Sequence, residues 1–528
     1  MPRKPPLTSE FRRDPFGGDV ETLALRAFGR AAGAPHSEGN AVRLLLDARE
    51  NFPAWLDAIR AAERLILFEC YILDDDDVGR EFARALVERA RDGVAVFVLY
   101  DWVGSISSGY YWQSLRDQGL RVAAFNPFQF ATPLGWVMRD HRKTIAIDGR
   151  VGFVSGLCVS GRWLGDDKRN LEPWRDTGVE IRGPAVADLE QAFVEVWRAT
   201  GEAPIPQRAL TPPDAIGAAG DVRVRTVAGQ PGTASTYRLD LLVAALAHER
   251  LWLTDAYFVG TAAYVQALRA AARDGVDVRL LVPGASDIPA VSMLSRAGYR
   301  SLLTAGIRVF EWNGTMLHAK TAVADGHWSR IGSTNLNLAS LVGNYELDVA
   351  IEDDAFAARM AAQFEADLAR ATEIVLTPKN RVRRASPLPP EARVRRSGAG
   401  SARRAAAGAV SVGSALGAAL TNRRALGPAE ASMLAFMALV SIGVGIVAAV
   451  WPRVVAWPAA VIIVWVGLSW LGRAWSLRHE THAQTELVEE PADDVQSPTP
   501  VTTANGPVGE RADERAPTSL ARGGADLL

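Results

Sequence analysis

The chain has 528 residues and a formal net charge of −2, and a length of this order accommodates two to four domains. Hydrophobic residues make up 48% and charged residues 22%, which is typical of a globular protein with apolar additions. Two cysteines, Cys70 and Cys158, exclude a disulfide framework and favour a reducing compartment. The N-terminal segment 1–38 begins with MPRKPPLTSEFRRDPFGG, which has charge but no apolar core, so we expect no signal peptide there.

From residue 39 onward, the same predicted elements occur twice in the same order. The pairs are amphipathic helices at 51–62 and 236–248, apolar strands at 63–73 and 249–259, strands after Arg-Asp-Gly at 91–101 and 273–283, and strands after Gly at 118–125 and 305–312. An interval of roughly 180 residues is far longer than a solenoid repeat. The pattern therefore indicates a duplicated α/β domain, a mixed sheet flanked by helices. We expect repeat 1 at 39–205, a linker at 206–221 and repeat 2 at 222–376.

Each half then carries His-x-Lys followed, after four residues, by Asp. The copies are His141, Lys143 and Asp148 in the first half and His318, Lys320 and Asp325 in the second. Apolar residues alternate after each Lys, which predicts a strand with His and Lys on one face. Such a face suits a phosphate, because imidazole can be a nucleophile or general acid and the ammonium balances phosphoryl charge. Each Asp precedes Gly, so turn chemistry is an alternative role for both.

Four further polar residues complete the candidate site. Ser333 and Asn335 follow the second motif and offer hydrogen-bond donors to phosphoryl oxygens. Glu346 and Asp176 hold corresponding places after the second and first motifs, and a carboxylate bonded to a ring nitrogen fixes the tautomer of a histidine. The sequence has no His/Cys/Asp cluster with metal-ligand spacing, so we expect neither a metal nor another cofactor.

These residues resemble the phospholipase D superfamily, whose signature is His-x-Lys-x4-Asp with a downstream Gly-Ser-x-Asn. The second motif matches fully through Gly332, Ser333 and Asn335, whereas the first continues as SGLC and places Cys158 where the family has Asn. Within the superfamily the chain is most similar to bacterial cardiolipin synthases, through FECYILDDDDVG (68–79), DAYFVG (255–260) and GSTNLNLASLVGNYELDV (332–349). The resemblance covers residues 40–375.

The resemblance implies two tandem phospholipase D-type repeats forming one pseudo-symmetric unit with a single active site between them. It implies that one His becomes a phosphatidyl-histidine, which the headgroup of phosphatidylglycerol then attacks to give cardiolipin. Following the family's usual assignment, we expect His141 to be the nucleophile and His318 the acid and then the base.

The C-terminal part has a different character. A basic linker at 377–427 carries Lys and Arg through 379–404, which predicts contact with an anionic membrane surface. A transmembrane helical hairpin is predicted at 428–473, because 431–451 and 454–472 are uncharged and each is close to the length that crosses a bilayer. Arginines flanking the hairpin predict that both ends, and the catalytic unit, face the cytoplasm at the bacterial inner membrane. The acidic tail 474–528 is predicted to be disordered.

Three alternatives remain open at this level. Water in place of a lipid alcohol would make the protein a phospholipase D-type hydrolase with the same catalytic residues. The same motif also cleaves nucleic-acid phosphodiesters, but the basic charge lies beside the predicted hairpin, so we do not expect a nucleic-acid partner. Cys158 raises the third alternative, a degenerate membrane scaffold, against which the intact His and Lys of both halves argue.

Overall fold

The computed structural model of the chain describes residues 20–128, 138–166, 171–378 and 381–386, with isolated positions between 446 and 471. Residues 1–19 and the predicted tail 474–528 lie outside this part, as do most of the predicted basic linker and hairpin. Among the residues that the structure describes, no helix is both long enough and apolar enough to cross a bilayer. The fold described below is therefore that of the two repeated halves.

The first half is built on a mixed sheet with the strand order β4-β3-β2-β6-β7-β8-β1. Its central strands β2, β3 and β4 run parallel, and the other neighbours are antiparallel. Every residue of β2 is buried, as expected for a continuous apolar strand covered on both faces. The strands are β1 (Ser37–Leu46), β2 (Leu65–Cys70), β3 (Ala95–Asp101), β4 (Arg121–Phe125), β6 (Lys143–Ile147), β7 (Val151–Ser155) and β8 (Thr177–Arg182).

The second half repeats this arrangement strand for strand, in the order β12-β11-β10-β13-β14-β15-β9. Two further strands, β16 and β17, extend its outer edge beyond β12. The strands are β9 (Val222–Gly229), β10 (Arg250–Thr254), β11 (Asp277–Pro283), β12 (Arg308–Trp312), β13 (Thr321–Ala324), β14 (Trp328–Gly332), β15 (Asn344–Glu352), β16 (Ala371–Leu376) and β17 (Val382–Arg384).

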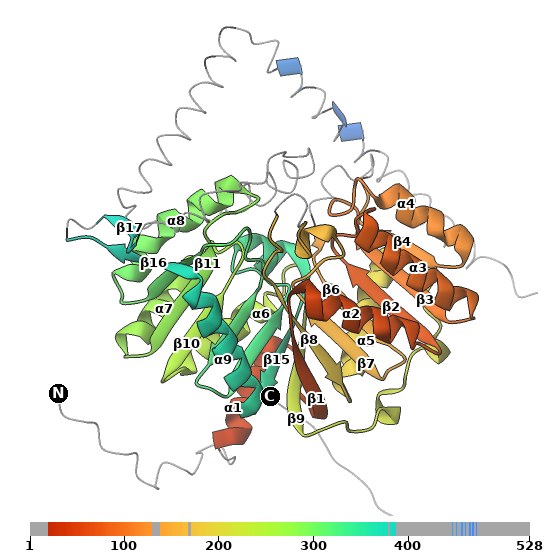
Figure 1. The fold of residues 1–528 in the computed structure, drawn as a ribbon, viewed down its shortest axis with the longest axis horizontal. Helices are drawn as coiled ribbons and strands as arrows, with labels where there is room; N and C mark the ends of the chain where they lie inside the picture. The colour runs from red at the N-terminus through yellow and green to blue at the C-terminus, as the bar shows by residue number, and fades with distance from the viewer. Residues whose placement is uncertain are drawn as a thin grey trace, which may run out of the picture. The chain divides into compact units, whose positions relative to one another are not determined.

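The two halves meet through their equivalent strands β1 and β9, which pair antiparallel with a shift in register between Ser37 and Asn40. A short strand of the first half, β5 (Arg139–Asp140), also pairs parallel with the start of β15. The halves therefore lie side by side, the first coloured red to yellow and the second green to teal in Figure 1. Asp140, just before the first motif, therefore lies beside the start of β15, and Leu317, just before the second, forms an isolated bridge with Arg175 of the first half.

Helices cover the sheets and enclose three apolar cores. One core joins the first sheet to α2, α3 and α4, and a second joins the other sheet to α6, α7 and α8. The third combines α5 and α9 with strands of both halves, which ties the halves together. The helices are α1 (Val20–Ala32), α2 (Asp47–Arg60), α3 (Asp77–Arg91), α4 (Gly109–Ser114), α5 (Ala185–Ala199), α6 (Ser235–Leu246), α7 (Ala262–Arg273), α8 (Pro289–Leu303) and α9 (Asp354–Ala369).

The repeated Arg-Asp-Gly sequence ends α3 and α7 in the same way. Gly93 and Gly275 have φ values of +90° and +99°, a backbone conformation that glycine adopts without a Cβ penalty. The next residues, Val94 and Val276, donate their backbone N–H groups back to the last helical turn. In each half the chain then enters a parallel strand, so the matched sequence produces a matched helix-to-strand turn.

Candidate active site

The two motif histidines are positioned by backbone bonds that cross between the halves. His141 precedes β6 and donates its backbone N–H to the carbonyl of Tyr345 at 2.9 Å. His318 precedes β13 and donates its backbone N–H to the carbonyl of Arg175 at 2.7 Å. The residues that follow these two carbonyls in the chain are Glu346 and Asp176. Each histidine is therefore placed beside the carboxylate of the opposite half.

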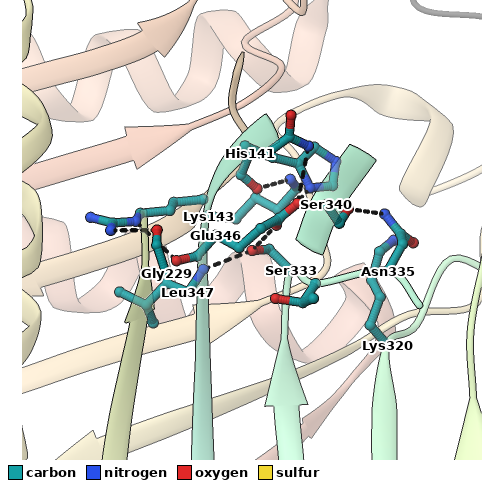
Figure 2. A network of polar contacts seen from close by, with 12 residues as sticks. His141, Lys143, Gly229, Lys320, Ser333, Asn335, Ser340, Glu346 and Leu347 are labelled. Atoms are coloured by element: carbon teal, nitrogen blue, oxygen red, sulfur yellow. Dashed lines mark hydrogen bonds and ion pairs between the residues drawn. The ribbon is translucent and has the colours of Figure 1, made fainter. Parts of the chain in front are cut away.

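Both imidazole rings hydrogen-bond to these carboxylates through Nδ1. The Nδ1 of His141 lies 2.9 Å from Oε2 of Glu346, as drawn in Figure 2. The Nδ1 of His318 lies 2.8 Å from Oδ2 of Asp176. All four side chains are buried. The structure thus brings together these four predicted residues in two equivalent pairs, each with one partner from each half.

Glu346 is held by three side chains at once. Besides His141, its carboxylate accepts the hydroxyl of Ser333 at 2.5 Å and the amide of Asn344 at 3.1 Å. The Ser333 oxygen in turn accepts the backbone N–H of Leu347 at 3.0 Å (Figure 2). A serine has a single O–H donor, and here Glu346 receives it. Ser333 therefore orients Glu346 in this structure, and a hydrogen bond from Ser333 to a phosphoryl oxygen stays a prediction.

Asp176 is held differently, because the first half has Gly156 where the second has Ser333. A Cβ at Gly156 would lie 2.2 Å from Oδ1 of Asp176, so the shorter carboxylate occupies the space that a serine would need. The indole Nε1 of Trp163, in the short helix η4 (Gly161–Trp163), donates to Oδ2 of Asp176 at 2.9 Å. Trp163 thus donates a hydrogen bond to Asp176 in the way that Ser333 donates one to Glu346.

The motif lysines lie on the same faces as their histidines but make different contacts. Lys143 donates to the backbone carbonyl of His141. Lys320 donates to the carbonyl of His318, and its Nζ also lies 2.9 Å from the ring Nε2. Among the described residues, the Nε2 of His141 has no such hydrogen-bond partner. The two histidines are therefore chemically unequal despite their matched positions.

An aromatic ring accompanies each motif at matched places in the two halves. Tyr71 lies edge-on to His141 with ring centroids 4.8 Å apart, and the Lys143 ammonium is 5.1 Å from the Tyr71 centroid. Tyr257 lies in the same way beside His318, with centroids 5.9 Å apart. Neither tyrosine was among the residues predicted from the sequence, although both occupy matched positions in the two repeated strand segments. Trp163 has no counterpart in the second half, so no repeat signal indicated it.

Electrostatics keep both rings neutral and both carboxylates ionised. Burial, followed by the Lys320 ammonium, lowers the pKa of His318 to about 3, and burial is also the largest cause of the lowered pKa of His141. Burial opposes ionisation of Glu346 and Asp176, but the paired histidine and nearby ammonium groups outweigh it, and both carboxyl pKa values lie below their ordinary range.

Each ring also responds to the lysine of the other half. Lys320 lowers the pKa of His141, and Lys143 lowers the pKa of His318. The two motifs therefore occupy one electrostatic neighbourhood. A neutral ring that donates Nδ1–H to a carboxylate keeps the Nε2 lone pair for an electrophile or a proton, which is what nucleophilic and acid–base catalysis require.

Asn335 and Cys158 occupy equivalent places after the two motifs. The Asn335 Nδ2 lies 3.5 Å from the Ser340 hydroxyl, and its buried Oδ1 has no hydrogen-bond partner among the described residues. Cys158 is buried in the first half. No group of three or more His, Cys, Asp or Glu within the described residues could hold a metal ion.

The motif aspartates do not reach this site. Asp148 follows the far end of β6 and accepts the backbone N–H groups of Glu63, Arg64 and Leu65 at 2.7–2.9 Å. Asp325 accepts three backbone N–H groups, from residues 248–250, at 2.8–3.0 Å. Both have positive φ, at +55° and +50°. A strand separates each aspartate from its histidine. Each closes a turn and anchors the start of β2 or β10, which is the alternative role that the Asp-Gly sequence offered.

Comparison with known proteins places these residues in a wider context. The family model described as cardiolipin synthase, PLD-like domain matches residues 243–368. Cardiolipin synthase A of Pseudomonas aeruginosa (strain LESB58) is 37% identical over 369 residues, covering 68% of this chain and 73% of that protein. Cardiolipin synthase A of Pseudomonas fluorescens (strain SBW25) is 38% identical over 363 residues, covering 66% and 73%. The solved structure of phosphatidylserine synthase from Haemophilus influenzae Rd KW20 shares the fold, with a TM-score of 0.53 and 14% identity over 66% of this chain and 91% of that one.

Proposed function

The chain belongs to the phospholipase D-like cardiolipin synthase family, and from this membership we propose that it is a membrane-anchored phosphatidyltransferase that makes cardiolipin from phosphatidylglycerol. The observation that carries the proposal is the doubled His–carboxylate pair, with Glu346 on His141 and Asp176 on His318. Two neutral imidazoles and two ammonium groups in one buried site suit a two-step transfer of a phosphoryl group.

In the first step, Nε2 of His141 attacks the phosphorus of a phosphatidylglycerol molecule. The bond from phosphorus to the glycerol headgroup breaks, and a proton from the His318–Lys320 pair goes to the departing oxygen. The contact between Lys320 and the His318 ring supports this division of roles. Burial is the largest cause that lowers the Lys320 pKa, to about 8, and nearby charges of both signs act after it. A lysine with such a pKa gives up its proton more readily than an exposed one. Lys143, Lys320 and the Asn335 amide then face the charge on the phosphoryl oxygens.

In the second step, a headgroup hydroxyl of another phosphatidylglycerol attacks the phosphatidyl-histidine. His318 accepts the hydroxyl proton, the bond between phosphorus and His141 breaks, and cardiolipin leaves. Glu346 stabilises the positive charge that His141 carries while it is bonded to phosphorus. Glycerol is released once per cardiolipin formed, and the site returns to its starting protonation.

Exposed apolar side chains around the site favour a lipid over a nucleic acid. His141 lies at the carboxyl end of β2, since Cys70 at that end pairs with Lys143. The segments that follow the carboxyl ends of neighbouring strands carry large apolar groups, and Tyr110 on α4 is 91% exposed while Met293 on α8 is 62% exposed. A lipid surface would cover such groups.

Membrane attachment forms part of the proposal. The basic stretch 379–404 would contact anionic lipid, and the apolar hairpin 428–473 would span the bilayer with both ends in the cytoplasm. This arrangement would put the catalytic unit at the cytoplasmic face of a bacterial inner membrane. Protease treatment of inverted and right-side-out vesicles would test it, since only inverted vesicles should expose the catalytic unit.

Purified full-length protein in vesicles of phosphatidylglycerol tests the activity. We expect cardiolipin and glycerol in equal amounts. Phosphatidic acid with glycerol would instead assign a hydrolase, and turnover of a nucleic-acid phosphodiester without lipid turnover would assign a nuclease. Absence of all three activities in folded protein would leave the scaffold alternative and overturn the proposal.

The nucleophile is tested by trapping the covalent lipid. A phosphatidylglycerol labelled in its acyl chains should label wild-type protein and the His318→Ala variant after a single turnover, but not the His141→Ala variant. Lipid adduct on His141→Ala would reverse the two histidine roles without affecting the assignment of the activity.

A further inference from the structure

The only two cysteines in the 528-residue sequence, Cys70 and Cys158, are both buried in the same apolar core of the first half. Cys70 is the last residue of β2, and Cys158 follows β7, yet the backbone N–H of Val159 bonds to the carbonyl of Ile72 at 3.2 Å. The Cys70 thiol donates to that same carbonyl at 3.2 Å, so the Ile72 carbonyl links Cys70 to the residue that follows Cys158. Both side chains are at most 2% exposed.

The pair belongs to the first half alone. The repeated segments FECY and TDAY align Cys70 with Ala256, and the segments after the motifs align Cys158 with Asn335. Both positions therefore differ together from their counterparts in the second half. Because the Ile72 carbonyl accepts both the Cys70 thiol and the N–H that follows Cys158, the two altered positions form one local feature rather than two separate departures.

The thiol pair is close to the groups assigned to phosphate binding. Cys70 is the cross-strand partner of Lys143, so the two side chains project from neighbouring points of one face. Burial opposes ionisation of Cys158, but the hydrogen bond from Cys70 and the Lys143 ammonium outweigh it and lower the Cys158 pKa. Burial and the Cys158 neighbour raise the pKa of Cys70 well above its ordinary range. The Cys158 sulfur is thus the one suited to attack an oxidant, and Cys70 remains a thiol that can react afterwards.

We propose that Cys70 and Cys158 are a redox modification site, in which a peroxide converts the two thiols to a disulfide and the disulfide slows phosphatidyl transfer. The Cys158 thiolate attacks one peroxide oxygen, the O–O bond breaks, and the sulfur becomes a sulfenic acid as the other oxygen leaves as water. The Cys70 sulfur then bonds to Cys158 and displaces the second water. Two sulfurs lose one electron each, the peroxide gains both, and a thiol reductant reverses the change.

Oxidation should alter the site through the end of β2. The disulfide joins Cys158 to Cys70, the cross-strand partner of Lys143, and so shifts the strand ends that position this ammonium. Misplacement of one phosphate-binding group predicts a fall in the rate of transfer of about three- to tenfold, restored by dithiothreitol. The effect on the rate rests on the proposed function, whereas the disulfide itself does not.

Thiol counting on the full-length protein tests the disulfide directly. Protein treated with hydrogen peroxide is denatured, alkylated and analysed by mass spectrometry. We expect two alkylated cysteines before treatment, none after it, and a peptide pair joined through Cys70 and Cys158. Two alkylated cysteines after treatment that oxidises surface methionines, or oxidation of either cysteine without the linked pair, would overturn the proposal.

The variant Cys70→Ala is the matched control, because Ala256 holds this place in the second half. It should keep its basal rate, form no linked peptide and lose the dithiothreitol-reversible inhibition. Reversible inhibition of equal size in Cys70→Ala, or a disulfide in wild type with an unchanged rate, would overturn the regulatory part. If untreated protein does not transfer phosphatidyl groups, the proposed function fails, and the linked peptide still decides the modification site.

Discussion

Replacing Glu346 by Gln tests whether the carboxylate from the second half activates the histidine of the first. The change keeps the shape of the side chain and removes its charge. Glu346 is 2% exposed and its carboxylate accepts bonds from His141 at 2.9 Å, Ser333 at 2.5 Å and Asn344 at 3.1 Å. An amide has one acceptor oxygen and one donating NH2 group, so it cannot accept hydrogen bonds from all three donors. At least one contact is lost or brings the NH2 group against another donor.

The expected loss follows from these contacts. A hydrogen bond to a charged group contributes about 1.5–3 kcal/mol, and the wrong histidine tautomer in a Ser–His–Asp triad lowers kcat by about 10⁴. We therefore expect Glu346→Gln to lower kcat by about 10²–10⁴, or roughly 3–5 kcal/mol in activation free energy. The Glu346 charge raises the pKa of His141, so the acid limb of the pH–rate profile should also move to lower pH.

The assay measures cardiolipin formation in phosphatidylglycerol vesicles across a pH series, with thermal unfolding recorded in parallel. Glu352→Gln is the matched control, because Glu352 lies on the same strand and pairs with Arg223 at 3.2 Å away from the histidines. It should keep kcat within about twofold. A Glu346→Gln enzyme that is folded and within threefold of wild type would refute the role assigned to the pair.

Four further outcomes are expected. Trp163→Phe removes the N–H donated to Asp176 and should lower kcat about tenfold with little change in KM, whereas an unchanged kcat would make the tryptophan purely structural. Asp148→Asn and Asp325→Asn should each lower the free energy of unfolding in urea by about 1–3 kcal/mol and leave kcat nearly unchanged, and a selective loss of kcat would return them to the catalytic group. Unfolded His318 binds a proton below about pH 6.5, but the folded ring binds one only near its pKa of about 3. Its contribution to the free energy of unfolding should therefore fall by about 1.4 kcal/mol for each unit by which the pH is lowered between those values. A His318→Asn variant whose stability has the wild-type dependence on pH would contradict this. Arg175→Ala leaves Asp367 without its partner at 2.9 Å and should cost about 3–5 kcal/mol of stability, measured by thermal unfolding, whereas an unchanged melting temperature would remove Arg175 as a structural link between the halves.

Much of the fold was open to prediction because its signals are local. Alternating apolar residues, Arg-Asp-Gly turns and matched order identify the helices and strands of both halves, and each depends on residues close in sequence. The motif histidines and lysines were found for the same reason, since two residues that are two apart on a strand share a face whatever surrounds them. Tyr71 and Tyr257 carried the same repeat signal and were within reach of this reasoning.

The sequence by itself therefore determined a duplicated α/β unit with two His-x-Lys motifs at matched places. Only the tertiary structure decided that Glu346 serves His141 and Asp176 serves His318, because each pair joins residues far apart in the chain, 205 positions in the first case, through strands of opposite halves. It also separated the motif aspartates from the site and placed Trp163 in the role of Ser333. The reason is physical: strand periodicity fixes which way a side chain points, whereas its partner depends on how the sheets meet.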